Sequence, residues 1–212
     1  MKKEKQGPNY MIKLQYGNTN TFFIDGLLVD TDYAGTLPAF YREIKRNRIR
    51  IKDIHYILAT HYHPDHMGLI GELVEQGATL LLIDKQETAV HSSDYIFERD
   101  KTPYIPVDES RAKVITCTES RAFLKGIGVS GEVIETPSHS PDSISLILDD
   151  GDCFVGDLEP AEYIEAYENN AQLKEDWERI MSSHPKRIFY AHRPEKTVTN
   201  ISKEERAYDE QM

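Results

Sequence analysis

A short polar cluster directly behind an apolar run limits what this chain can fold into more than any other feature does. The apolar run covers residues 54–59, and the heptapeptide after it, residues 60–66, reads Thr-His-Tyr-His-Pro-Asp-His. This heptapeptide holds three of the eight histidines of the chain. Imidazole and carboxylate groups bind divalent first-row metals, and groups packed so closely would titrate against one another near neutral pH unless a cation held them. The cluster therefore predicts a metal site at the end of a buried strand.

Length and composition fit one globular unit. The chain has 212 residues, of which 39% are hydrophobic and 29% charged, and such a length can enclose the core of a single α/β domain. We expect residues 1–195 to form that domain and residues 196–212 to form a polar C-terminal tail or short helix. We predict no membrane span, because no apolar stretch approaches the roughly 18 residues that one requires. The first ten residues lack the apolar core of a secretory signal, which favours a cytoplasmic location.

Charge and cysteine content narrow the classes of partner. The net charge of −11 argues against nucleic acid, because that affinity comes largely from Lys and Arg side chains on phosphates. The two cysteines, Cys117 and Cys153, lie far apart and do not form the pairs typical of thiolate zinc sites. We therefore expect a small-molecule substrate, and the sequence leaves the oligomeric state open.

The two halves of the chain have a similar plan. In the first half, apolar residues 21–24 and 27–29 flank Asp25-Gly26, and in the second half residues 144–148 and 153–155 flank Asp150-Gly151. Asp-Gly favours a tight hairpin because its residues accept positive φ. The repetition predicts a two-fold pseudo-symmetric sandwich. The other expected elements are helices at about 38–46, 69–77 and 170–181, and strands at 54–59, 80–83, 132–135 and 187–190.

Residues 91–108 carry no clear periodicity. The segment contains Tyr95, Phe97 and Tyr104. A loop of this length in a compact domain is often functional, so one interpretation is a wall or lid over the site. The other is a surface excursion that packs its aromatic side chains on the core.

Three further motifs each follow a predicted strand. Residues 136–143 read Thr-Pro-Ser-His-Ser-Pro-Asp-Ser and contain His139, residues 155–157 end in Asp157, and residues 190–192 end in His192. In this order behind the heptapeptide, they resemble the signature of the metallo-β-lactamase superfamily, over about residues 20–192. The family usually has glycine where Ser138, Asp142 and Arg193 stand here.

The resemblance implies a fold and a set of metal ligands. The fold is an α/β class, four-layered αβ/βα sandwich with its metals at one edge of two facing sheets. The cofactors are two Zn²⁺ ions, with Fe or Mn as further options. The spacing suits this arrangement, with one metal on His61, His63 and His139, the second on Asp65, His66 and His192, and Asp157 shared between them.

The resemblance also implies a reaction. We expect a hydrolase of a small ester, thioester or lactone that acts through a hydroxide bridging the two metals, with Asp65 as the catalytic residue that moves a proton to the leaving group. The alternative is a mononuclear iron oxidoreductase similar to persulfide dioxygenases. A third reading is a non-catalytic domain that keeps its metal for folding or sensing.

Several residues near the motifs are further candidates for a role at the site or in the fold. Arg193 and Tyr104 are candidate substrate contacts. Asp30 and Asp32 resemble the family's Asp-Thr-Gly turn, and they either orient ligand imidazoles or form a simple turn. His55 is expected to be a core or edge residue of its strand.

Overall fold

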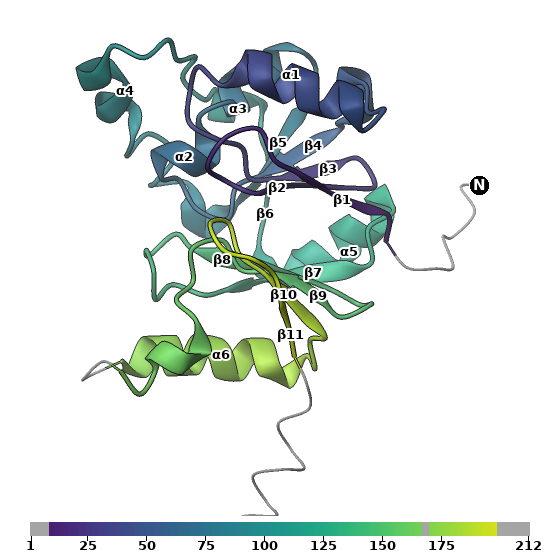
Figure 1. The fold of residues 1–212 in the computed structure, drawn as a ribbon, viewed down its shortest axis with the longest axis vertical. Helices are drawn as coiled ribbons and strands as arrows, with labels where there is room; N and C mark the ends of the chain where they lie inside the picture. The colour runs from purple at the N-terminus through teal and green to yellow at the C-terminus, as the bar shows by residue number, and fades with distance from the viewer. Residues whose placement is uncertain (1–8, 167–169, 199–212) are drawn as a thin grey trace, which may run out of the picture.

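Two β-sheets face each other, and helices cover their outer faces (Figure 1). The structure is a computed structural model that describes residues 9–166 and 170–198. The first sheet has the order β1-β2-β3-β4-β5-β6, with β1 Met11–Leu14, β2 Thr21–Ile24, β3 Leu27–Val29, β4 Tyr56–Leu58, β5 Thr79–Ile83 and β6 Lys113–Ile115. The second has the order β11-β10-β9-β8-β7, with β7 Gly131–Glu135, β8 Ile144–Leu148, β9 Asp152–Phe154, β10 Arg187–Phe189 and β11 Lys196–Thr197.

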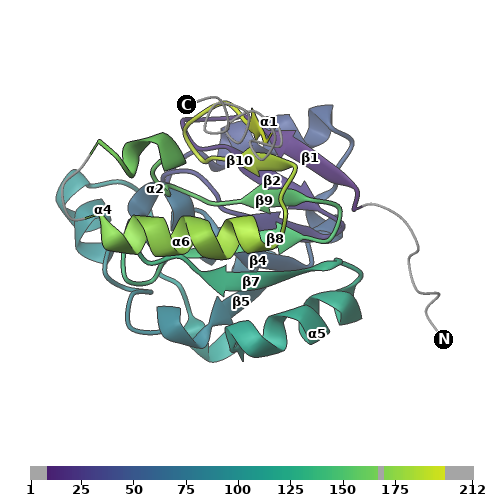
Figure 2. The same ribbon diagram turned by 90° about the horizontal axis from the view of Figure 1, so that it is seen from below.

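The helices form the outer layers of the molecule. They are α1 Leu37–Arg46, α2 Pro64–Met67, α3 Ile70–Glu75, α4 Asp94–Asp100, α5 Cys117–Ile127 and α6 Ala171–Ser182. Helices α1 and α3 lie on the first sheet and α6 on the second, while α5 lies beside β7 at one side of the sandwich (Figures 1 and 2). Within the described residues, no helix has the length and apolar character needed to cross a bilayer.

Alternating side chains explain why the strands are apolar on both faces. In β2, Phe23 packs toward the helices of the first outer layer, whereas Phe22 points into the core between the sheets. In β10, Ile188 packs toward α6, and Phe189 joins the core between the sheets. Side chains two residues apart share one face of a strand, so each central strand serves two cores. The three separate cores confirm the predicted four-layered α/β sandwich.

The core between the sheets is rich in aromatic rings. The ring of Phe22 lies 4.8 Å from that of Phe154 and 5.5 Å from that of Phe189, centroid to centroid. Edge-to-face pairs at such distances are favourable beyond the area that they bury. These contacts join β2 of the first sheet to β9 and β10 of the second.

The first predicted hairpin is confirmed. Asp25 and Gly26 have φ values of 48° and 95°, and Ile24 pairs with Leu27 across this two-residue turn. Positive φ at both positions gives a turn whose twist matches that of the flanking strands.

Strand directions bring the loops of interest to one edge. β3, β4 and β5 are mutually parallel. β7 and β9 are both antiparallel to β8, and β10 is parallel to β9, so β7, β9 and β10 run in one direction. The amide of Ile144 donates to the carbonyl of Thr60 at 2.9 Å and ties the end of β4 to the second sheet. The predicted ligands follow the carboxyl ends of β4, β7, β9 and β10.

Some elements were not expected from the sequence. β1 and β6 are short strands at the two edges of the first sheet, and α5 lies between β6 and β7 in the chain. A signal for α5 was present, because Thr116 and Glu119 form a capping box and Gly128 ends the helix with φ 97°. Lys196 and Thr197 pair with β10 as β11, which corrects the expected tail. The rest of that tail, residues 199–212, lies outside the described residues.

The segment at residues 91–108 contains a helix, α4, which its lack of periodicity did not indicate. Phe97 is 1% exposed, and its ring packs against Tyr33 and Tyr104 at centroid distances of 5.0 and 4.2 Å. The Ser93 hydroxyl donates to the carbonyl of Tyr62 at 2.6 Å. The segment thus packs aromatic side chains on the core and also contacts the heptapeptide. A role as a lid stays a prediction.

Candidate metal centre

Seven predicted side chains converge at the edge of the two sheets. When each residue offers one ligand atom, three groups have all of these atoms within 4.8 Å of one another. The groups are His61, His63 and His139; His61, His66 and Asp157; and Asp65, His66 and His192. We call the first of these the three-histidine group and the last the Asp65 group.

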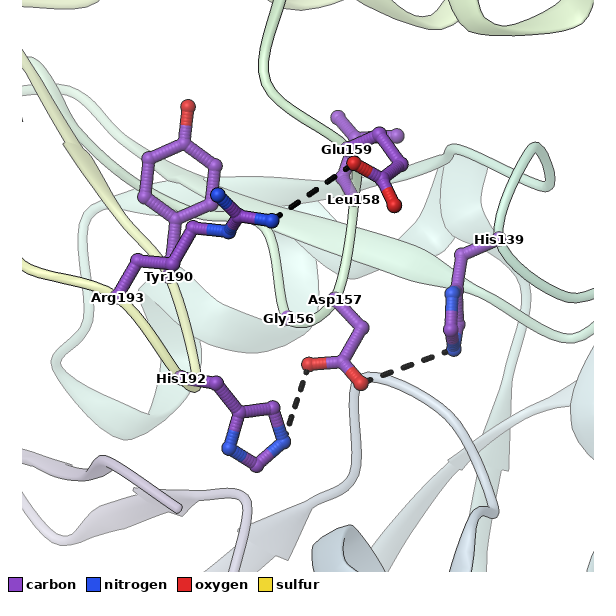
Figure 3. A pocket seen from close by; sticks show the side chains of 8 residues that line it. All are labelled: His139, Gly156, Asp157, Leu158, Glu159, Tyr190, His192 and Arg193. Atoms are coloured by element: carbon purple, nitrogen blue, oxygen red, sulfur yellow. Dashed lines mark ion pairs between the residues drawn. The ribbon is translucent and has the colours of Figure 1, made fainter. Parts of the chain in front are cut away.

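Asp157 lies between these two groups and presents one oxygen to each. Its Oδ2 is 3.7 Å from His139 Nε2 and 4.0 Å from His61 Nε2. Its Oδ1 is 3.3 Å from His192 Nε2 and 3.4 Å from His66 Nε2. Figure 3 shows the carboxylate between His139 and His192. This is the placement expected of a ligand shared by two cations.

Backbone geometry explains how Asp157 reaches the heptapeptide. Gly156 has φ 57°, and a Cβ atom at this position would lie 2.4 Å from Thr60 Oγ1. Glycine is therefore required both by its dihedral angle and by this close approach. Within the heptapeptide, Pro64 lies in the first turn of α2, where its missing N–H does not matter, and that turn carries Asp65 and His66.

Two buried imidazole nitrogens test whether this site suits a metal. The side chains of His61 and His66 are fully buried, and the Nε2 atom of each finds no hydrogen-bond partner in the part of the chain that the structure describes. An unsatisfied buried polar atom costs about 1–3 kcal/mol. A cation held jointly with the neighbouring nitrogens and carboxylates would remove this cost, so the donor set fits divalent metal ions.

The Nδ1 atoms of His66 and His192 each lie beside a hydrogen-bond acceptor. His66 Nδ1 lies 3.1 Å from Asp30 Oδ2, and His192 Nδ1 lies 3.1 Å from the carbonyl oxygen of Asn18. Each acceptor favours a proton on Nδ1, which leaves Nε2 free to bind a metal. These contacts turn both rings toward the centre of the site.

The electrostatics of the two groups differ. Burial, together with the neighbouring imidazoles, holds the pKa of His61 well below its usual value. Burial also lowers the pKa of His66, but the carboxylates of Asp30 and Asp157 outweigh it and raise that pKa to about 10. A cation held by Nε2 would take the place of the proton, so the same carboxylates that favour a charged ring would also favour a bound metal.

The two aspartates of the first turn have different roles. Asp30 accepts hydrogen bonds from the Thr60 amide at 2.6 Å and the Thr60 hydroxyl at 2.9 Å besides its contact with His66. It therefore orients the ligand segment. Asp32 accepts from the amides of Thr19 at 3.2 Å and Tyr33 at 2.6 Å, which is the turn role. His55 is exposed just before β4 and is not a core residue, although its backbone bonds to Gly26 and Thr79 on either side.

A pocket of about 170 Å³ opens beside the predicted metal ligands. It is lined by His139, Gly156, Asp157, Leu158, Glu159, Tyr190, His192 and Arg193 (Figure 3). The Arg193 guanidinium lies 3.9 Å from Glu159 Oε2 and 5.5 Å from the centre of the Tyr163 ring. The predicted substrate residue Arg193 is thus on the pocket wall.

Tyr104, the other predicted substrate residue, does not line this pocket. Its hydroxyl donates to Asp94 at 2.9 Å, and its ring stacks on Phe97. Tyr104 was a candidate substrate contact because it is an aromatic residue in a segment without expected secondary structure. The structure uses that side chain to pack the segment on itself.

Sequence reasoning missed the groups that hold the ligand loops. These are Asn18 behind His192, Gln86 beneath the heptapeptide, and Asp176 of α6 behind Ser138. Gln86 and Asp176 contact the backbone of distant segments, and Asn18 contacts the distant His192 imidazole through its own carbonyl. No local pattern marks such residues. Asp142 and Ser138 were visible only as departures from the family's glycines.

Several known proteins resemble this chain in sequence. The family profile described as the metallo-beta-lactamase superfamily matches residues 15–192. The "Beta-lactamase-like protein 2 homolog" of Drosophila melanogaster is 30% identical over 136 residues, which are 64% of this chain and 44% of that protein. The "Putative diflavin flavoprotein A 2" of Synechocystis sp. is 28% identical over 144 residues, 66% of this chain and 22% of that protein. The chain thus spans less than half of the length of these curated relatives.

Solved structures share the fold. A metallo-beta-lactamase family protein from Thermus thermophilus superposes with a TM-score of 0.64 at 20% identity, over 96% of this chain and 79% of that one. The protein TTHA1623, solved in a di-iron-bound form, superposes with a TM-score of 0.65 at 20% identity, over 89% of this chain and 94% of that one. At this level of identity the likeness concerns the fold alone.

Proposed function

Since this chain belongs to the metallo-beta-lactamase superfamily, we propose that it is a hydrolase that uses two divalent cations, with Zn²⁺ as the first choice, to cleave a small ester, thioester or lactone. The observation that carries this proposal is the position of Asp157, whose two oxygens face two different groups of ligand atoms. A site for a single ion would need only one such group. Because the curated relatives are more than twice as long as the matched region, the activity of the whole protein is likewise proposed here.

The residues of the chain would divide the work of hydrolysis. When bound, a pair of divalent cations supplies activation of water near neutral pH and polarisation of a carbonyl group. Asp157, which presents one oxygen to each ligand group, would fix the distance between the two cations. Asp65 is 36% exposed at its side chain, and its Oδ2 lies 3.1 Å from His192 Nε2. This carboxylate would accept a proton from the attacking water and return it to the leaving group.

The pocket beside the ligands suits a small substrate with polar groups. Arg193 offers a cation on one wall. Glu159 offers a carboxylate, whose Oε2 lies 3.9 Å from the Arg193 guanidinium and makes no hydrogen bond to any described residue. A carboxylate or phosphate of the substrate would pair with the guanidinium. We propose a small molecule, and not nucleic acid, as the substrate.

An iron-dependent oxidoreductase is the second candidate. The Oδ2 atom of Asp157 faces both His61 and His139, and two histidines with one carboxylate are the ligand set of many non-haem iron oxygenases. Iron is a candidate metal because the chain is similar to a putative diflavin flavoprotein and shares its fold with TTHA1623, which was solved in a di-iron-bound form. This candidate differs from the first in the identity and number of the metal ions.

One experiment separates the two candidates. The purified protein is analysed for metals and then assayed on a panel of lactones, thioesters, phosphoesters and a β-lactam, and on a persulfide with an oxygen electrode. Two zinc ions per chain with hydrolysis of a panel compound support the proposal. One iron per chain with oxygen consumption on the persulfide supports the second candidate. A protein that binds no metal under any condition contradicts both.

A further inference from the structure

The loop that carries His139 is tied to the heptapeptide by a buried carboxylate. Asp142 is 9% exposed, and its Oδ2 accepts a hydrogen bond from the Tyr62 amide at 2.7 Å. Tyr62 stands between His61 and His63 in the chain. Asp142 Oδ1 accepts from the Ser140 hydroxyl at 2.7 Å, next to His139. One side chain thus contacts the neighbours of all three members of the three-histidine group.

Gln86 strengthens the same connection from below. Its side chain is fully buried, and its Nε2 donates to the carbonyl of Ala59 at 3.0 Å and to that of Asp142 at 3.1 Å. Ala59 follows β4 and leads into the heptapeptide. Two independent contacts therefore hold Asp142 against the segment that carries His61 and His63.

The other side of the loop is anchored as well. The Ser138 amide donates to Asp176 Oδ2 at 2.8 Å, and Asp176 is a fully buried residue of α6. His139 lies between this anchor and Asp142, and its Nε2 is 3.2 Å from His63 Nδ1. Metal ligands must be placed to within about 0.2 Å, so a small shift of this loop would disturb the three-histidine group.

The Asp65 group has supports that do not involve Asp142. The Thr19 hydroxyl donates to the Asp65 carbonyl at 2.7 Å, Asp30 holds His66, and the Asn18 carbonyl contacts His192. These supports come from the first sheet and its loops. Loss of Asp142 should therefore affect one group of ligands and spare the other.

We propose that Asp142 is a positioning residue that sets the metal affinity of the three-histidine group by holding His139 against His61 and His63. This inference rests on the proposed function, because it requires that the two groups bind metal. It gives a role to a residue that stands where the family usually has glycine.

The test measures Co²⁺ binding in backgrounds that isolate each group. His192→Ala weakens the Asp65 group, so the Co²⁺ absorption spectrum of this variant reports binding at the three-histidine group. His63→Ala weakens the three-histidine group, so the spectrum of that variant reports binding at the Asp65 group. We expect Asp142→Ala to weaken Co²⁺ binding roughly 10- to 100-fold in the first background and to leave the second unchanged. Asp142→Asn should show a smaller loss, because its amide oxygen can still accept from Tyr62.

The chain offers a matched control in Asp152. This residue is 6% exposed and accepts two hydrogen bonds from Arg187, at 2.7 and 2.5 Å. It begins β9, whereas Asp157 follows the other end of that strand. Asp152→Asn should lower the melting temperature and leave Co²⁺ affinity at both groups unchanged.

Each outcome of the test has one reading. Unchanged Co²⁺ binding in Asp142→Ala overturns the inference, and so does equal weakening in both backgrounds, which would indicate a general loss of structure. If Asp142→Ala does not fold, Asp142→Asn carries the comparison. A wild-type protein that binds no Co²⁺ overturns the proposed function together with this inference, whereas the failures named above leave the proposed function standing.

Discussion

At the scale of single residues, the site depends on which nitrogen of each imidazole faces inward. Asp30 holds Nδ1 of His66 and the Asn18 carbonyl holds Nδ1 of His192, so that Nε2 of each ring points to the centre. The buried Nε2 atoms of His61 and His66 make no hydrogen bond to any described residue. Buried nitrogens without a hydrogen-bond partner raise the free energy of the metal-free site. This favours the binding of a cation.

Replacement of Asp65 tests its role in proton transfer. We expect Asp65→Asn to lower kcat about 100- to 10,000-fold, because an amide cannot take up a proton from the attacking water. Steady-state kinetics on the best panel substrate, with metal content measured on the same sample, checks this. A variant that keeps both metals and the wild-type kcat would refute the role assigned to Asp65.

Arg193 should affect substrate selection without disturbing its neighbour His192. Its carbonyl accepts from the Asn20 side chain at 3.2 Å, a contact that does not involve the guanidinium. We expect Arg193→Ala to raise KM roughly tenfold for anionic substrates and to leave neutral ones unchanged, since a charge-assisted hydrogen bond is lost only with the former. Arg193→Lys is the control that keeps the charge. Equal effects on both substrate classes would speak against the assignment.

At the scale of elements, the segment around α4 is closed by a chain of hydrogen bonds. His91 Nδ1 lies 2.7 Å from Asp94 Oδ2, and His91 Nε2 lies 3.0 Å from Glu109 Oε2. The Tyr104 hydroxyl donates to the other oxygen of Asp94 at 2.9 Å. The His91 imidazole therefore joins Asp94, in the first turn of α4, to Glu109, directly after residue 108.

The order of this segment should depend on pH. Hydrogen bonds to Asp94 and Glu109 raise the pKa of His91 above its ordinary value. Because the folded-state pKa is the higher one, the stabilisation is complete below the unfolded pKa of about 6.5 and is lost as pH rises through the folded-state pKa. The ring is 46% exposed, so solvent screening keeps the effect small.

Hydrogen exchange provides the measurement. After correction for intrinsic rates, amides of residues 91–109 should lose protection as pH rises through the raised pKa of His91. His91→Gln should remove this step, because its amide does not titrate. If the variant and the wild type show the same pH dependence, the change arises elsewhere.

At the scale of the whole molecule, the site joins the two halves of the sandwich. His61, His63, Asp65 and His66 follow the first sheet, whereas His139, Asp157 and His192 follow strands of the second. Cations shared between these loops would connect the sheets as covalent links do. Binding to the native state alone adds about 4 kcal/mol of stability when free metal exceeds its Kd about 1,000-fold.

Chelation should therefore destabilise the fold. For a chain of this size each kcal/mol corresponds to about 2–4 °C, so removal of the metals is expected to lower the melting temperature by roughly 8–16 °C. Thermal scans with and without a chelator, followed by return of Zn²⁺, check this. A doubly substituted His63→Ala and His192→Ala protein should not respond. An identical melting temperature before and after chelation of the wild type would contradict the prediction.

The sequence by itself determined the features that local patterns encode. Short continuous apolar runs indicated strands buried on both faces, Asp25-Gly26 indicated a tight hairpin, and the heptapeptide with its three later motifs indicated the family and the fold. These predictions succeed because period, turn chemistry and residue type act over a few neighbouring positions. The seven ligands stay a prediction that the geometry supports.

The tertiary structure alone decided which distant residues support that site. The contact of Asp142 with Tyr62 spans 80 positions, and that of Asp176 with Ser138 spans 38. It also placed Tyr104 against Phe97, away from the pocket, and turned Lys196 and Thr197 into a strand. Such contacts depend on strand order and on loops that close between the sheets, and a chain reveals neither until its two halves have packed together.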